Sequence, residues 1–172
     1  MAAIRRIRAS EGAALRDIRL RAIGDSPEAF AVSHAATVAQ GEEAWTAWAT
    51  MSAEGDSRVL YVATDAGRWV GLAGGMLDAP QQAVASLISM WVDPLYRGRG
   101  LGRQLVEHVA AWARHRGACR LELWVTEGNG AAIALYTRCG FRMSTERQPH
   151  PVDPTRTEQK TQQKMVCEPY AS

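Results

Sequence analysis

Short runs of alternating or continuous apolar residues predict the strands of this chain. Residues 57–64 and 68–76 read as two strands, and the Asp-Ala-Gly turn between them predicts a β-hairpin. A longer apolar run at residues 84–92 predicts a strand that leads into a glycine-rich segment. Further strands are expected at residues 3–8, 119–126 and 164–168.

Helical spacing of apolar residues predicts the remaining elements. Leu15, Ile18 and Ala22 form a stripe on a first helix over residues 10–24. The alanine-rich segment 28–51 predicts a helix or a pair of helices that lies over the sheet. Another helix should follow Gly100 and stop at Gly117, and a last helix should run from Asn129 to Gly140. The polar residues 144–163 predict a long exposed connection.

The order of these elements predicts an α/β fold of the mixed, α+β kind. A strand-rich first half is followed by strand, helix, strand, helix and strand, which is not the regular alternation of a doubly wound sheet. At 172 residues the chain is expected to form one domain, 1–172.

Composition excludes several kinds of protein. The formal net charge of +2 is too small to indicate nucleic acid or an anionic membrane as the main partner. Three cysteines without a Cys-x-x-Cys spacing predict neither a metal site nor a disulfide framework. The sequence has no signal-peptide pattern and no apolar run long enough to span a membrane. We therefore expect a cytoplasmic protein that needs no metal.

The segment between residues 92 and 103 has the features of an anion site. Gly98, Gly100 and Gly102 allow positive φ angles and remove side chains that would keep an anion away from the backbone. The helix that follows offers its unpaired N–H groups and the positive end of its dipole. Arg97, Arg99 and Arg103 add positive charge nearby. The segment matches neither the P-loop nor the dinucleotide pattern, so we expect it to bind a phosphate or pyrophosphate in another way.

Two stretches together resemble the acyl-CoA signature of the GNAT superfamily of N-acetyltransferases. The first is Arg97-x-x-Gly100-x-Gly102 after a strand that ends in Val92-Asp93-Pro94. The second is the segment 129–141, with an asparagine, a tyrosine seven residues later and a Gly-Phe pair at its end. The resemblance implies the GNAT fold, a mixed sheet of six or seven strands with helices on both faces and a splay between the two central parallel strands.

The resemblance also implies where acetyl-CoA would lie. The glycine segment would bind the pyrophosphate through backbone amides, and the pantetheine arm would fill the splay between strands 84–92 and 119–126. Backbone groups of Met90 and Val92 would pair with that arm, with the thioester near Trp91. The implied cofactor-binding residues are Met90, Trp91, Val92, Arg97, Gly98, Arg99, Gly100, Leu101, Gly102, Arg103, Asn129, Ala132 and Tyr136.

Asn129 and Tyr136 lie about two helical turns apart and would therefore share one face of the last helix. Asn129 could bind the pantetheine amides, although its position also fits a helix N-cap. By resemblance Tyr136 is the general acid, since a phenol can donate a hydrogen bond or a proton to the departing thiolate. The alternative for Tyr136 is a structural role in the core.

The general base is not identified by the sequence. Many GNAT proteins carry a glutamate on the strand before the glycine segment, but residues 85–90 contain no carboxylate. Glu28 and Glu122 are the two alternatives, and each could instead be a solvated or ion-paired carboxylate. Glu28, Phe30 and Trp91 are expected to line the acceptor pocket.

The interpretation is an N-acetyltransferase that moves an acetyl group from acetyl-CoA to a primary amine of a small molecule in a ternary complex. Two alternatives stay open: a protein N-terminal or lysine acetyltransferase, and a non-catalytic CoA-sensing module. Family members often form homodimers, but no surface pattern in the sequence indicates one. The acceptor, the base, the oligomeric state and the length of the acyl group are left open.

Overall fold

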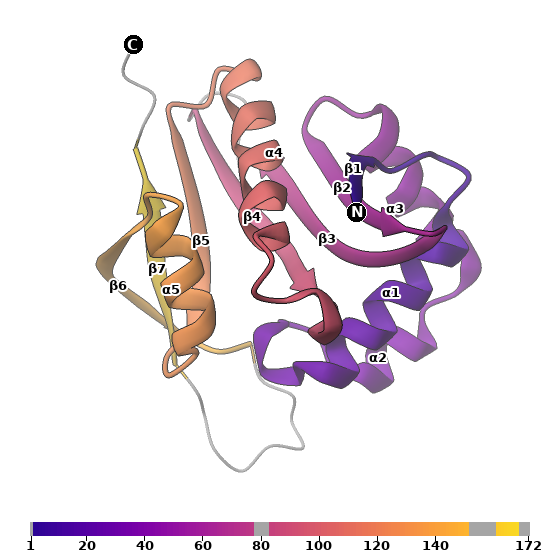
Figure 1. The fold of residues 1–172 in the computed structure, drawn as a ribbon, viewed down its shortest axis with the longest axis horizontal. Helices are drawn as coiled ribbons and strands as arrows, with labels where there is room; N and C mark the ends of the chain where they lie inside the picture. The colour runs from indigo at the N-terminus through magenta and orange to yellow at the C-terminus, as the bar shows by residue number, and fades with distance from the viewer. Residues whose placement is uncertain (1, 78–82, 152–160, 169–172) are drawn as a thin grey trace.

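A seven-stranded sheet organises the part of the chain that the structure describes. The computed structural model describes residues 2–77, 83–151 and 161–168. The strands follow the order β1-β2-β3-β4-β5-β7-β6. β4 and β5 pair in parallel and all other neighbours are antiparallel (Figure 1). The strand bounds are β1 Ala3–Arg6, β2 Arg58–Asp65, β3 Arg68–Leu77, β4 Val84–Val92, β5 Arg120–Thr126, β6 Arg142–Pro149 and β7 Thr161–Cys167.

Helices cover both faces of the sheet. α4 and α5 lie on the face toward the viewer in Figure 1, whereas α1 and α3 pack on the opposite face. The strand β2 shows why both faces are apolar: Val59 and Ala63 belong to the core under α4, and Leu60 and Val62 to the core under α1 and α3. The helix bounds are α1 Gly12–Asp25, α2 His34–Ala39, α3 Glu42–Glu54, α4 Leu101–His115 and α5 Gly130–Arg138, with 3-10 turns η1 Pro27–Ala29 and η2 Pro94–Tyr96.

The two parallel strands separate after a short paired stretch. β4 and β5 pair at Val84 with Arg120, Ala85 with Leu121 and Ser86 with Glu122, and the pairing then stops. Both strands continue, to Val92 and Thr126, so their remaining halves diverge toward the end where β4 meets the glycine segment (Figure 1). The predicted splay is confirmed.

A β-bulge lies in β4 where the splay begins. On the β3 side, Leu72 pairs with Trp91 and Gly74 with Ile88, so two residues of β4, Ser89 and Met90, face one residue of β3. Ser89 has a positive φ of 56°, which is uncommon for a residue with a side chain. The bulge begins three residues after Ser86, the last residue of β4 that pairs with β5.

The predicted exposed connection over residues 144–163 is wrong at both ends. Residues up to Pro149 belong to β6, and β7 already begins at Thr161; residues 152–160 lie outside the described part. β6 is the edge strand at one side of the sheet and most of its side chains are exposed, so it lacks the apolar alternation that reveals a strand.

The helices α2 and α3 confirm the helix pair expected in the alanine-rich segment.

Candidate functional site

The glycine segment forms a tight corner between β4 and α4. Gly98 and Gly100 have φ angles of 74° and 80°, in the left-handed region that favours glycine. Gly100 is the N-cap of α4 and supplies no side-chain cap. The first backbone bond of the helix joins the Gln104 N–H to the Gly100 carbonyl at 3.1 Å. The N–H groups of residues 101–103 therefore have no partner within the helix, which suits an anion.

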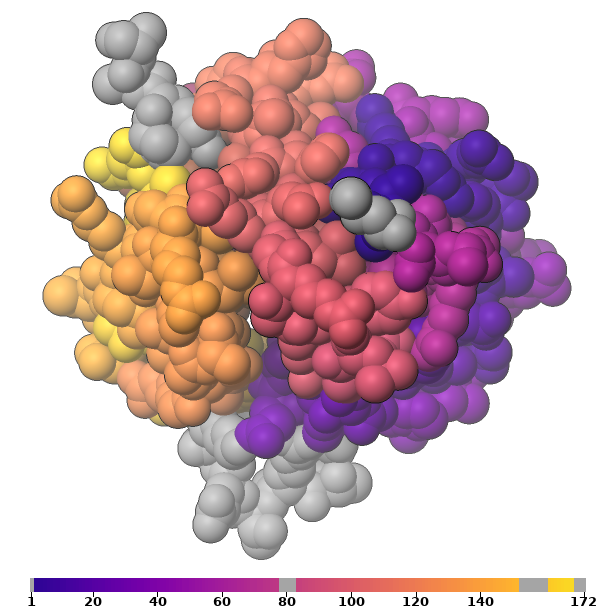
Figure 2. Space-filling view, in the orientation of Figure 1, coloured from indigo at the N-terminus to yellow at the C-terminus, as the bar shows by residue number. Residues whose placement is uncertain are grey.

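Gly102 serves packing rather than turn geometry. A Cβ atom at this position would lie 3.2 Å from Leu135 Cδ2 on α5 and 3.3 Å from Met90 Cε on β4. The absence of a side chain thus lets the first turn of α4 approach both walls of the splay. Figure 2 shows a narrow hollow between the orange atoms of the α5 region and the red atoms of the corner.

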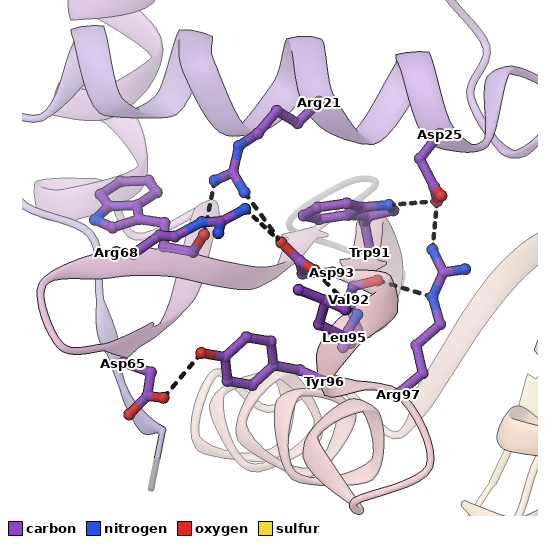
Figure 3. A network of polar contacts seen from close by, with 11 residues as sticks. Arg21, Asp25, Asp65, Arg68, Trp91, Val92, Asp93, Leu95, Tyr96 and Arg97 are labelled. Atoms are coloured by element: carbon purple, nitrogen blue, oxygen red, sulfur yellow. Dashed lines mark hydrogen bonds and ion pairs between the residues drawn. The ribbon is translucent and has the colours of Figure 1, made fainter.

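Ion pairs hold the corner against the first half of the chain (Figure 3). The Asp93 carboxylate accepts from the backbone N–H of Leu95 at 3.1 Å and so caps η2. Its other oxygen accepts from Arg21 at 3.3 Å and from Arg68 at 3.0 Å. Asp93 is buried, so its side chain is held in place by its surroundings. The two arginines that bind it therefore fix the position of the residue that follows β4.

Arg97 is directed toward α1 and not into the corner (Figure 3). Its Nε donates to the Val92 carbonyl at 2.9 Å, and its Nη2 donates to the Asp25 carboxylate. Asp25 also accepts from the Trp91 indole N–H at 2.9 Å. Partial burial acts to raise the pKa of Asp25, but hydrogen bonds from Ser26, Trp91 and Arg97 outweigh it and lower the pKa below its usual value.

The other two arginines of the segment also have neighbours of their own. Arg99 lies over the Tyr96 ring, 5.8 Å from its centroid, and Arg103 pairs with Glu107 at 2.7 Å. Arg97 and Arg103 are each paired with a carboxylate, so the backbone N–H groups of residues 101–103 and the Arg99 guanidinium are the donors left for an anion.

The edge of β4 that faces the splay carries backbone groups without a strand partner. Asp93 donates its N–H to the Val70 carbonyl at 2.9 Å. In an antiparallel pair the next residue back, Val92, therefore directs its backbone groups to the opposite edge, toward β5. The Val92 carbonyl accepts from Arg97, which leaves its N–H as the group available to a ligand in the splay.

α5 and its N-cap carry Asn129 and Tyr136, the two cofactor-binding residues predicted on the last helix. The Asn129 side-chain oxygen accepts from the Ala132 N–H at 3.2 Å, so Asn129 is the N-cap of α5. Tyr136 is 8% exposed, and its ring packs against Phe141 with centroids 5.8 Å apart. Within the described residues its hydroxyl has no hydrogen-bond partner. Burial raises the pKa of the Tyr136 phenol well above its usual range, which keeps the hydroxyl protonated.

Glu28 and Glu122, the two candidates for the general base, lie at different ends of the splay. Glu122 pairs with Ser86 of β4 at the closed end, and its carboxylate binds Arg120 at 2.7 Å and Lys164 at 3.1 Å. Glu28 lies in η1, and its backbone carbonyl accepts from the Thr126 hydroxyl at 2.7 Å. Thr126 ends β5, so Glu28 lies at the open end, level with the bulge of β4.

Two of the three predicted pocket residues, Phe30 and Trp91, are buried in the core under α1, whereas Glu28 is exposed. Phe30 packs against the guanidinium of Arg19, 4.7 Å from the ring centroid. The Trp91 indole N–H donates to Asp25. Trp91 thus shapes the site through its backbone, whereas Phe30 and Glu28 lie on the segment that follows α1.

Sequence reasoning missed Arg19, Asp25, Ser89, Thr126 and His150. Arg19 could have been found, because it falls inside the apolar stripe of α1, four residues after Leu15 and three before Ala22. The other four have no local signal. The His150 ring, for example, contacts the Glu28 carbonyl at 2.9 Å from a position 122 residues away.

The sequence profile of the Acetyltransferase (GNAT) family matches residues 25–141. The chain belongs to this family. Mycothiol acetyltransferase of Beutenbergia cavernae is 38% identical over 86 residues, which are 50% of this chain and 29% of that protein. The [ribosomal protein bS18]-alanine N-acetyltransferase of Escherichia coli is 46% identical over 63 residues, 37% of this chain and 43% of that one. The matches therefore span less than half the length of these relatives.

Solved structures of the family share the whole fold. A GNAT-family acetyltransferase from Streptococcus pneumoniae has a TM-score of 0.82 at 21% identity, over 96% of this chain and 98% of that one. YncA of Salmonella typhimurium, described as a putative acetyltransferase with its cofactor acetyl-CoA, has a TM-score of 0.78 at 21% identity, over 98% and 94%. At this identity the likeness establishes the fold.

Two further properties limit the kinds of site. Within residues 2–77, 83–151 and 161–168, no group of three His, Cys, Asp or Glu side chains is placed to hold a metal ion. Among the helices described, none is both long enough and apolar enough to cross a bilayer.

Proposed function

We propose that this protein is an acetyl-CoA-dependent N-acetyltransferase that acts on the primary amine of a small molecule. The observation that carries the proposal is the uncapped N-terminus of α4 at the Gly98–Gly100 corner, directly beside the splay between β4 and β5. The corner suits a pyrophosphate, and the splay suits an extended arm. Together they fit the two ends of an acyl-CoA.

Residues of both walls would hold the cofactor. The N–H groups of residues 101–103 would bind the pyrophosphate, since they lack helical partners. The Val92 N–H would pair with the pantetheine arm as a neighbouring strand would. Bound acetyl-CoA would supply a thioester that a neutral amine can attack. Arg97, held by Asp25, would keep the corner in place without binding the phosphates itself.

Tyr136 would protonate or hydrogen-bond the departing sulfur. Its phenol is buried in the core that includes α4, and burial keeps it in the protonated form that can donate. A hydroxyl without a partner among the described residues is consistent with a donor that meets its acceptor in the complex. Donation to a developing thiolate is strongest where water is excluded.

Glu28 would serve as the general base, directly or through a water molecule. A free alkylamine is mostly protonated at neutral pH, so the acceptor must lose a proton before it attacks. Glu28 is exposed at the open end of the splay, level with the bulge of β4. The pairing of Glu122 with Arg120 and Lys164 favours a structural role for that carboxylate.

A peptide acceptor is the second proposal, because one relative is named for the alanine of a ribosomal protein. Thiol release from acetyl-CoA, measured with amino acids, polyamines, aminoglycosides and short peptides, would decide between the two. We expect turnover with a small amine. Turnover with peptides alone would overturn the small-molecule acceptor in favour of a peptide. Binding of acetyl-CoA without any turnover would favour a CoA-sensing module.

A further inference from the structure

Arg19, in the middle of α1, is a cation that the fold buries without an acid. The residue is 6% exposed, and its guanidinium lies over the rings of Phe30 and Trp48, 4.7 and 5.1 Å from their centroids. Its Nη1 donates to the Ser89 hydroxyl at 3.3 Å. Its Nε is buried and has no hydrogen-bond partner.

Neighbouring arginines show that the fold usually supplies a partner. Arg21, two residues further along α1, pairs with Asp93, and Arg97 pairs with Asp25. No carboxylate in the described part of the chain forms an ion pair with Arg19. The indole N–H of Trp45, which stacks on Trp48, is also buried without an acceptor. The surroundings of Arg19 are therefore rich in donors and poor in acceptors.

Such an arrangement is costly unless something compensates it. A buried charge loses its hydration, and an unpaired buried N–H loses a hydrogen bond to water. Burial lowers the pKa of Arg19 to about 10, so the guanidinium is still charged at neutral pH. The two aromatic rings compensate part of the cost but cannot accept an in-plane bond from Nε.

The position of Arg19 links it to the proposed reaction. Its partner Ser89 is the positive-φ residue of the β4 bulge, two residues before Trp91, where the thioester is expected. Its aromatic neighbour Phe30 follows η1, which carries Glu28. Two residues of a strand span about 7 Å. A carboxylate bound at Arg19 and an amine at the thioester would therefore belong to one small molecule whose amine lies several bonds from its acid group.

We propose that Arg19 binds a carboxylate of the acceptor, and that the acceptors are amino acids or similar amines that carry a carboxylate. The inference rests on the proposed function and names its substrate class. The Nε edge of a guanidinium can hold both oxygens of a carboxylate in its plane. Phe30 and Trp48 fix that plane and keep water from it. The carboxylate thereby directs the amine toward the bulge of β4 and the splay.

The test compares matched acceptors that differ only in charge. Each L-amino acid is assayed beside its own amide, with acetyl-CoA and thiol release as the readout, and a phosphonate analogue distinguishes a carboxylate from another anion. We expect kcat/KM to be about 100-fold or more higher for the acid than for the amide. Arg19→Met should remove that preference, while the KM for acetyl-CoA stays within about twofold. Arg142→Met, at an exposed arginine of β6, is the matched control and should keep the preference.

A second readout separates this inference from the proposed function. Binding of the same amino acids and amides is measured by calorimetry in the presence of CoA, without any reaction. Acid-selective binding that Arg19→Met abolishes, in a protein that acetylates nothing, would support the Arg19 site and overturn the transferase. Acetylation of acids and amides at equal rates, or of peptides in preference to both, would overturn the Arg19 proposal and leave the transferase. Tighter binding of the phosphonate analogue than of the amino acid would overturn the carboxylate as the group that Arg19 binds.

Discussion

The guanidinium of Arg97, in the glycine corner, donates to the carboxylate of Asp25 at the end of α1, 72 residues earlier in the chain. The same carboxylate accepts from the indole of Trp91 on β4. One acidic side chain thus links the corner, the strand that leads into it and the end of α1. The affinity for the cofactor should depend on this carboxylate, although we do not expect it to touch the cofactor.

Asp25→Asn should weaken binding of acetyl-CoA by something like 3- to 30-fold, since a neutral amide holds Arg97 less strongly than a carboxylate. The turnover number should change less than the KM, because the hydroxyl of Tyr136, which we propose as the general acid, is unaffected. Calorimetric titration with CoA measures the effect. Asp17→Asn, exposed on the same helix, is the control. Equal affinities in all three proteins would show that the corner does not need this tie.

Gly100→Val should abolish cofactor binding. At a φ of 80° a β-branched residue is strained by more than about 1 kcal/mol, so the corner would rearrange and move the first N–H groups of α4. The shift in melting temperature that CoA produces in the parent protein should disappear. Gly24→Ala is a suitable control, because Gly24 is exposed and has no positive φ. A Gly100→Val protein that binds CoA normally would exclude this corner as the phosphate site.

The elements around the corner could be predicted from sequence because their signals are local. The strand β4, the glycine corner, the N-cap Asn129 and Tyr136 on α5 each depend on residues within a turn or two, and all lie where the pattern places them. The pair of glycines with positive φ is a property of the backbone alone. A mixed sheet with a splay then follows from the family resemblance.

What the sequence did not reveal depends on contacts between distant residues. β6 was missed because an outer strand with mostly exposed side chains has no apolar alternation. Arg97 was expected to face the anion, but it binds Asp25 instead. That contact depends on how the end of α1 is placed beside β4, which the sequence does not show. Arg19 and Ser89 are 70 residues apart, and only the fold shows that one is bound to the other.

Tyr136→Phe should lower kcat by about 10²–10⁴-fold if the hydroxyl donates to the departing sulfur. Affinity for acetyl-CoA should stay nearly the same, because the ring and its contact with Phe141 are kept. The melting temperature should not fall either, since within the described residues the hydroxyl has no partner to lose. Tyr61→Phe, a part-buried tyrosine beside His108, serves as the control. Unchanged turnover would remove Tyr136 from the mechanism.

Arg19→Met should stabilise the protein while it impairs the reaction with carboxylate-bearing acceptors. Replacing a buried unpaired cation by an apolar side chain of similar length removes a desolvation penalty, and a gain of about 1–3 kcal/mol in the free energy of unfolding is reasonable. Urea denaturation at pH 7 without ligand measures it. A loss of stability of the same size would mean that the stacking between Phe30 and Trp48 is the main role of Arg19.

The stability of the N-terminal segment should depend on pH through Glu11. Its carboxylate binds Arg5 at 2.6 Å and the Arg8 N–H at 2.9 Å, and the bond from Arg5 is the largest cause that lowers the pKa of Glu11. The pKa of Glu11 is lower in the native protein than in the unfolded chain. The unfolded chain therefore binds more protons near pH 4, and the protein becomes less stable as the pH is lowered through that range. The contribution is complete above the unfolded pKa of about 4.3 and disappears as the pH drops through the native pKa. Glu11→Gln should therefore melt a few degrees below the parent at pH 7, a loss of about 1 kcal/mol, and converge with it once the pH is below the native pKa of Glu11. Glu54→Gln, exposed at the end of α3, should melt with the parent at both pH values; a constant gap for Glu11→Gln across the range would show that the charge of Glu11 is not what stabilises the segment.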